Sequence, residues 1–203
     1  MEKFRLTVKN YRCFSDENPL SFNLSRQYTA LIGQNNSGKS ALLRMIYELK
    51  ELWNNIASPD QFKHFFNPNF RTGISYRNVP DYTEIFNNDN NREITIEITD
   101  VMPVENGIST VACTCHQDTN QWVFSVLDRN KGQISNTIQA TKIDYGDFQI
   151  DGHGIARCGA IIRFSEILAN SLYIGPFRNA INVGSGTYYD LNVGTDFVKT
   201  WNA

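Results

Sequence analysis

The sequence has no long apolar run. None of its 203 residues falls in a stretch that approaches the roughly 18 consecutive apolar residues of a membrane-spanning helix. The start, Met1 to Phe4, does not open a signal-peptide hydrophobic region. We therefore expect a cytoplasmic protein without a membrane partner. The formal net charge is −2, so no overall positive charge indicates nucleic-acid binding. The net charge does not exclude a local basic face.

Cysteines are few, and their spacing forms no paired C-x-x-C motifs, so disulfides are not implied. The four are Cys13, Cys113, Cys115 and Cys158. The segment 113–116 (Cys-Thr-Cys-His) resembles half of a metal site. However, Val111, Cys113 and Cys115 alternate as in a β-strand and would share one face. We interpret them as small apolar residues on a buried strand face.

The most informative feature that is present is the segment 33–40, Gly-Gln-Asn-Asn-Ser-Gly-Lys-Ser. It satisfies the phosphate-loop pattern G-x-x-x-x-G-K-[ST] at every fixed position. Residues 28–32 before it are apolar enough for a strand, and residues 42–56 after it have the periodicity of an amphipathic helix. The apolar positions of that helix are Leu42, Met45, Ile46, Leu49, Trp53 and Ile56. A strand, a glycine loop and a helix in this order direct backbone N–H groups at a polyphosphate.

The pattern predicts a binding site for a nucleoside triphosphate with Mg²⁺. Its cofactor-binding residues are Gly33, Gln34, Asn35, Asn36, Ser37, Gly38, Lys39, Ser40 and Ala41. The glycines let the backbone wrap the phosphates without a clash from Cβ. We expect Lys39 to contact the β- and γ-phosphate oxygens as the catalytic residue, and the hydroxyl of Ser40 to be the magnesium ligand.

The rest of the chain predicts an α/β fold, a P-loop core with a flanking antiparallel β-sheet. We divide this single ATP-binding lobe into a β-hairpin, loop and first helix (1–58), an irregular insertion that can include a short helix (59–91), antiparallel strands (92–150) and a final helix, strand and connector (151–203). The expected strands are 4–8, 20–24, 94–98, 110–116, 122–127, 143–150 and 171–174, with hairpin turns at 117–120 and 128–132 and a last helix over 155–170.

A nucleotide hydrolase of this class also needs an acidic residue at the end of a second apolar strand, which binds magnesium. The one candidate is 123–128, where Asp128 is followed by Arg129 instead of Glu. Asp128 also opens the predicted turn, so we interpret it as a turn residue. No Leu-Ser-Gly-Gly-like signature follows. We therefore expect these residues to be the first part of a longer chain, with negligible ATP turnover by themselves.

The quoted motifs resemble the N-terminal opening of RecF-like and SMC-like ABC ATPases. Within that group they look most like the ATPase part of the overcoming-lysogenization-defect (OLD) nucleases and related bacterial defence ATPases. Asn-Tyr-Arg-Cys-Phe at 10–14 is similar to the element with which those proteins leave their first strand, and residues 30–40 are similar to their phosphate loop. Tyr-Ile-Gly-Pro-Phe-Arg at 173–178 is more loosely similar to a later stretch of the same lobe.

The resemblance implies the N-terminal lobe of an ABC-type head that binds ATP and Mg²⁺. It further implies a head-to-head homodimer formed through a C-terminal lobe that is not in this chain, and Arg12 close to the nucleotide phosphates or base. The implied roles are DNA processing, repair or phage defence, and DNA is an open partner for the parent protein.

Two other functions compete with this one: a free-standing P-loop enzyme, either a GTPase or a small kinase, and a nucleotide-gated interaction module. A free-standing GTPase should have an Asn-Lys-x-Asp guanine-binding motif, and residues 128–131 have the wrong order. A small kinase should have an acidic substrate site and an arginine-rich lid, and neither is evident. A nucleotide-gated, non-catalytic interaction module differs from the ATPase mainly in whether a completed dimer turns over ATP.

Overall fold

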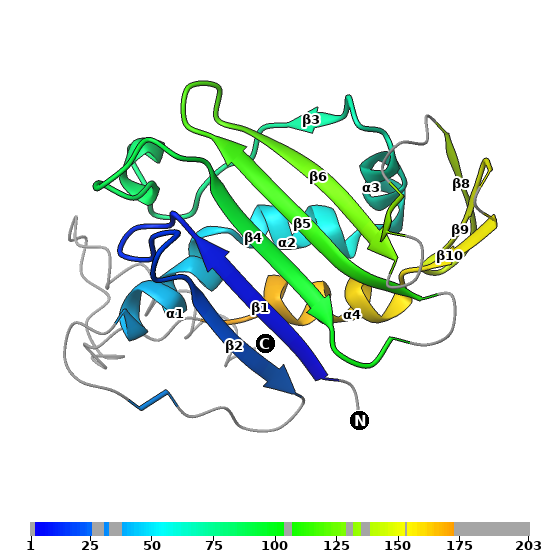
Figure 1. The fold of residues 1–203 in the computed structure, drawn as a ribbon, viewed down its shortest axis with the longest axis horizontal. Coiled ribbons are helices and arrows are strands. Elements are labelled where there is room, and N and C mark those ends of the chain that lie inside the picture. Colours follow the sequence, from blue (N-terminus) through cyan, green and yellow to red (C-terminus); the bar gives the residue numbers. More distant parts are fainter. Residues whose placement is uncertain are drawn as a thin grey trace, which may run out of the picture.

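The computed structural model describes residues 3–25, 31–32, 38–103, 107–128, 132–134, 139–152 and 154–172. Their main element is one antiparallel sheet whose strands run in the order β2-β1-β4-β5-β6-β3, with β7 beside β6 (Figure 1). Its strands are β1 (Lys3–Lys9), β2 (Leu20–Ser25), β3 (Arg71–Thr72), β4 (Ile94–Asp100), β5 (Ile108–His116), β6 (Gln121–Asp128) and β7 (Gly132–Gln133).

The central strands form as their alternation predicts. In β4 every second residue is buried, and Ile96 lies opposite Cys113 of β5. Val111, Cys113 and Cys115 are fully buried on this same face, which confirms the strand-face prediction. In the part of the chain that the structure describes, no group of His, Cys, Asp and Glu could hold a metal ion.

Three helices cover one face of the sheet: α1 (Lys39–Glu48), α2 (Lys50–Ala57) and α4 (Gly159–Ala169) (Figure 1). The single helix expected over 42–56 is wrong, because the backbone at Leu49 (φ −95, ψ 25) separates α1 from α2. The apolar stripe nevertheless continues through this break, and Leu49, Leu52 and Trp53 are all fully buried. None of the described helices is long and apolar enough to cross a membrane.

The insertion after α2 is mostly irregular, as predicted, but it holds more regular structure than the one short helix expected. It contains α3 (Pro59–Phe62), two short 3₁₀ helices, η1 (Lys63–Phe66) and η2 (Tyr82–Ile85), and the strand β3, which pairs with β6. Pro59 is the first residue of α3, where its missing N–H would have had no helical partner. The ring of Phe65 stacks on Phe124 of β6 with centroids 3.8 Å apart, which fixes the insertion on the sheet.

A second, three-stranded sheet corrects two predictions. It consists of β8 (Ala140–Asp144), β9 (Asp147–Ile150) and β10 (Gly154–Arg157). The single strand expected over 143–150 is therefore a hairpin that turns at Gly146 (φ +78). The helix expected from 155 begins only at Gly159, because residues 154–157 pair with β9. A Cβ at Gly146 would lie 2.5 Å from the Cα of Gly159, so this turn packs directly on the start of α4.

The predicted α/β class with antiparallel strands is confirmed, but the larger sheet does not merely flank the N-terminal core. β1 pairs with β4, with Leu6 opposite Ile98, so the N-terminal hairpin and the later strands form one sheet. Residues 28–30 of the strand expected over 28–32 lie outside the described residues, and Leu31 and Ile32 are not in a strand. For the strand expected over 171–174, Ser171 and Leu172 are likewise not in a strand, and the similar stretch 173–178 lies outside the described residues.

Candidate functional site

The described end of the phosphate loop forms the start of α1. Gly38 is the N-cap of this helix in a left-handed conformation (φ 82, ψ 1), and no described side chain caps the first turn. Lys39 is half-buried and Ser40 is exposed in that turn, followed by half-buried Ala41. The residues 33–37 (Gly, Gln, Asn, Asn and Ser) lie outside the described residues. The free N–H groups and the dipole at a helix N-terminus favour an anion.

The turn over residues 10–14 packs against this helix start. A Cβ added to Gly38 would lie 2.6 Å from Cε1 of Phe14 and 3.3 Å from Sγ of Cys13. Cβ atoms do not approach other heavy atoms so closely without a shift of one partner. Glycine is therefore required at position 38 both by its positive φ and by the side chains of this turn.

The same turn is held in an unusual conformation by hydrogen bonds. Asn10 (φ 57) and Arg12 (φ 47) are both in the left-handed region. The N–H of Arg12 donates to the carbonyl of Ile85 at 2.8 Å, and Nδ2 of Asn87 donates to the carbonyl of Arg12 at 2.6 Å. A left-handed residue other than glycine persists only where its surroundings fix it. The backbone of Arg12 is thus fixed from both sides.

Arg12 and Tyr11 both bind the carboxylate of Glu48. Nη2 of Arg12 lies 3.0 Å from each Glu48 oxygen, and the Tyr11 hydroxyl donates to Oε2. Glu48 is 5% exposed. Burial and then the negative charge of Glu48 raise the pKa of Tyr11 well above its ordinary value, so the hydroxyl stays protonated and donates. Removing one partner of such a buried ion pair costs about 3–5 kcal/mol.

Through these contacts the residues of the turn touch both ends of α1. Glu48 is the last residue of α1 and Gly38 precedes its first, so they are separated by ten helical steps, about 15 Å at 1.5 Å per residue. Cys13 and Phe14 contact the N-terminal end, whereas the guanidinium of Arg12 is bound to Glu48. The expected position of Arg12 near the nucleotide phosphates or base stays a prediction.

Asp128 and this turn lie at opposite ends of the strands of the sheet. The turn follows the C-terminal end of β1, and β1, β4, β5 and β6 alternate in direction. The C-terminal end of β6 therefore lies beside the start of β1, about 24 Å along the strands at 3.4 Å per residue. Asp128 is buried and pairs with Gly132 of β7, so the predicted hairpin after it is confirmed. Asp128 is the last residue of β6 and lies directly before the hairpin turn that it was predicted to open.

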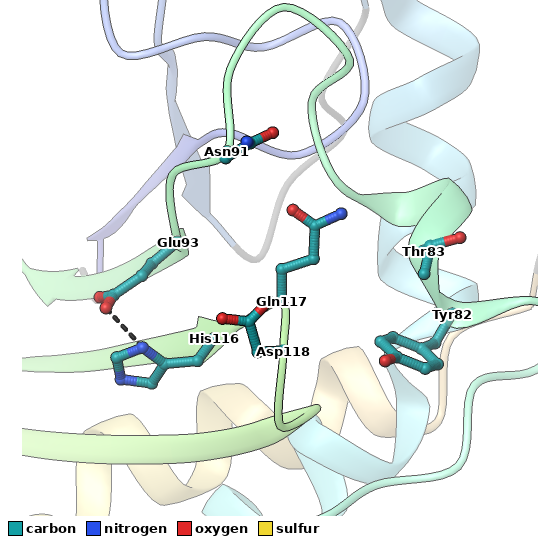
Figure 2. A pocket seen from close by; sticks show the side chains of 7 residues that line it. All are labelled: Tyr82, Thr83, Asn91, Glu93, His116, Gln117 and Asp118. Atoms are coloured by element: carbon teal, nitrogen blue, oxygen red, sulfur yellow. Dashed lines mark ion pairs between the residues drawn. The ribbon is translucent and has the colours of Figure 1, made fainter.

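A polar pocket of about 700 Å³ opens at the same sheet edge as the turn. It is lined by Tyr82, Thr83, Asn91, Glu93, His116, Gln117 and Asp118 (Figure 2). Nδ1 of His116 lies 2.5 Å from Oε1 of Glu93, and both side chains are nearly half exposed. Nδ2 of Asn10 donates to the carbonyl of Glu93 at 2.9 Å, which connects the pocket to the turn. An ion pair this exposed contributes little free energy.

The sequence interpretation missed Glu48, Tyr11 and the pocket. One signal for Glu48 was present, because it is three residues after Met45 and four before Leu52, on the apolar stripe of the helix. A carboxylate in such a position needs a partner. Nothing in the spacing indicated that the partners were Tyr11 and Arg12.

Residues 1–158 match the family model described as AAA ATPase domain. The match spans 158 of the 203 residues and includes the phosphate loop, α1 and all strands of the two sheets. No curated protein matches the chain.

Proposed function

Because this chain belongs to the family of AAA ATPase domains, we propose that it binds ATP with Mg²⁺ through the loop of residues 33–40. The observation that carries this proposal is the start of α1. Gly38 is left-handed and packed on Phe14, and Lys39 and Ser40 follow it in the first turn of the helix. This arrangement combines helix N–H groups, a cation and a hydroxyl at one point.

The residues fit the proposed ligand. Lys39 supplies positive charge for the β- and γ-phosphate oxygens, and the exposed hydroxyl of Ser40 is a hard oxygen ligand of the kind that Mg²⁺ prefers. The backbone N–H groups of residues 33–41 contribute the remaining hydrogen bonds to the phosphates. Bound magnesium would neutralise charge on the phosphate oxygens.

Thermal unfolding with and without Mg-ATP tests this proposal. Ligand at ten times Kd stabilises the native state by about 1.4 kcal/mol. For a chain of this size the melting temperature should rise by about 3–6 °C. Lys39→Ala should abolish the rise, and Ser40→Ala should abolish the part of it that depends on Mg²⁺.

Lys63→Ala is the matched control, because Lys63 is also half-buried but lies on η1. It should keep the full shift. An equal shift in the wild type and in Lys39→Ala would refute the assignment of the loop.

We further propose that the chain is the ATP-binding lobe of an ABC-type head that acts in DNA processing, repair or phage defence. The resemblance of residues 4–14 and 30–40 supports this. The partner would be a second copy, bound head to head through a C-terminal lobe not in this chain. Since Asp128 lies at the far sheet edge, the chain alone should hydrolyse ATP negligibly. Sedimentation with a non-hydrolysable ATP analogue should show no nucleotide-induced dimer, and such a dimer would mean that the composite site is complete here.

A further inference from the structure

Glu48 is a charged residue in a position that the helix pattern reserves for apolar side chains. It follows buried Met45 and Tyr47 and precedes fully buried Leu49. A buried carboxylate is unfavourable unless charged or hydrogen-bonding partners replace its hydration. Glu48 has three such contacts, two to Nη2 of Arg12 and one from the Tyr11 hydroxyl. The contacts satisfy the carboxylate and at the same time fix two side chains of the turn.

The turn connects the residues bound to Glu48 with the residues that pack on Gly38. Only one residue separates Arg12 from Phe14, and the N–H of Phe14 donates to the carbonyl of Tyr11 at 2.9 Å. Phe14 and Cys13 in turn occupy the space that a Cβ of Gly38 would need. A displacement of Tyr11 or Arg12 would therefore move the side chains that support Gly38.

We propose that Glu48 is a positioning residue for the nucleotide site: it anchors the turn through Arg12 and Tyr11, and the turn holds Gly38 and the start of α1 in the geometry that binds phosphate. This proposal rests on the proposed function, because it assumes that nucleotide binds at the loop. Glu48 acts at the far end of α1 and does not contact the ligand.

The ion pair persists when nucleotide binds. Pulling Arg12 away would leave a carboxylate that is 5% exposed without its cation, and this costs more than one charge-assisted hydrogen bond to a phosphate returns. The guanidinium also has a hydrogen-bond contact of Nε with the Tyr11 oxygen at 3.4 Å. Because the ion pair stays formed, Glu48 is better explained as a residue that positions the turn than as one that releases Arg12 to the nucleotide.

A double-mutant cycle on Mg-ATP affinity tests the proposal. Kd is measured by isothermal titration calorimetry well below the melting temperature of every variant. Glu48→Gln and Arg12→Gln should each raise Kd by about 2- to 30-fold, the range of couplings carried through a packed network. The Kd of the double variant should rise by less than the product of the two single effects, because Glu48 acts in part through Arg12.

Glu51→Gln is the control, since Glu51 is a helical carboxylate that bonds the N–H of Ser75 instead. Its Kd should equal that of the wild type. Unchanged Kd in Glu48→Gln, or effects of Glu48→Gln and Arg12→Gln that multiply, would overturn the proposal.

A second variant covers the case in which Glu48→Gln does not fold. Tyr11→Phe removes only one hydroxyl, and it should raise Kd more in the wild-type background than in Arg12→Gln, because both side chains hold the same carboxylate. An equal effect in both backgrounds would overturn the proposal. Absence of Mg-ATP binding by the wild-type protein would instead refute the proposed function.

Discussion

Substituting Gly38 by alanine tests the contact between the turn and the phosphate loop. The new Cβ would lie 2.6 Å from Cε1 and 2.8 Å from Cζ of Phe14, in a backbone with φ +82. The left-handed conformation costs an alanine about 1–2 kcal/mol. Overpacking against the ring adds about 1–3 kcal/mol, and the lower entropy of the unfolded alanine chain offsets at most about 1 kcal/mol. The free energy of unfolding should therefore fall by about 2–4 kcal/mol.

Urea unfolding of the nucleotide-free protein measures this change. Gly152→Ala is the matched control, because Gly152 has φ +79 and no described atom within 4 Å of an added Cβ. It should lose only the conformational part, about 1 kcal/mol. In a Phe14→Leu background, which removes the clashing ring edge, Gly38→Ala should cost no more than this control. If Gly38→Ala in the wild type destabilises no more than Gly152→Ala, the ring of Phe14 does not pack on the loop.

Three further predictions concern other parts of the molecule. Asp128→Asn should leave the Kd for Mg-ATP within about twofold, because the sites are distant, and a large loss in calorimetry would contradict the placement of Asp128. Ser165→Ala should raise the free energy of unfolding by about 1 kcal/mol, since the buried Ser165 hydroxyl has no hydrogen-bond partner in the described part of the chain; a loss in urea unfolding would show a hidden partner. Burial raises the pKa of Cys115 from 9.0 to about 11. Its thiol thus stays protonated in the native state while the unfolded thiol ionises, so stability present below pH 9.0 should be lost as the pH rises to about 11. Cys115→Ala should show a shallower loss over this range, and an unchanged slope would refute the shift.

The fold could be predicted from the sequence where one periodicity dominates. Ile94, Ile96 and Ile98 alternate with polar residues, so both the strand and its buried face follow directly. The break at Leu49 could not be predicted, because no glycine or proline marks it and the apolar stripe continues through it. The pairing of β1 with β4 was also hidden, since alternation identifies a strand but not its neighbour.

The candidate site could be proposed from the sequence to the extent that it is local. The phosphate-loop pattern depends on consecutive residues, and the structure gives Gly38, at the start of α1, a left-handed conformation. Glu48 could be recognised as a carboxylate in need of a partner, but Arg12 lies 36 residues earlier in the chain. Only the fold of the turn brings the two together.

Hydrogen exchange of backbone amides with and without Mg-ATP tests most directly where the nucleotide binds. Peptides that cover residues 33–42 should exchange more slowly with Mg-ATP, because their N–H groups bond phosphate oxygens. Peptides that cover residues 10–14 should also be slowed through the contact with Gly38, whereas those of residues 121–128 at the far sheet edge should not change. Slowed exchange at 121–128 with no change at 33–42 would contradict the account.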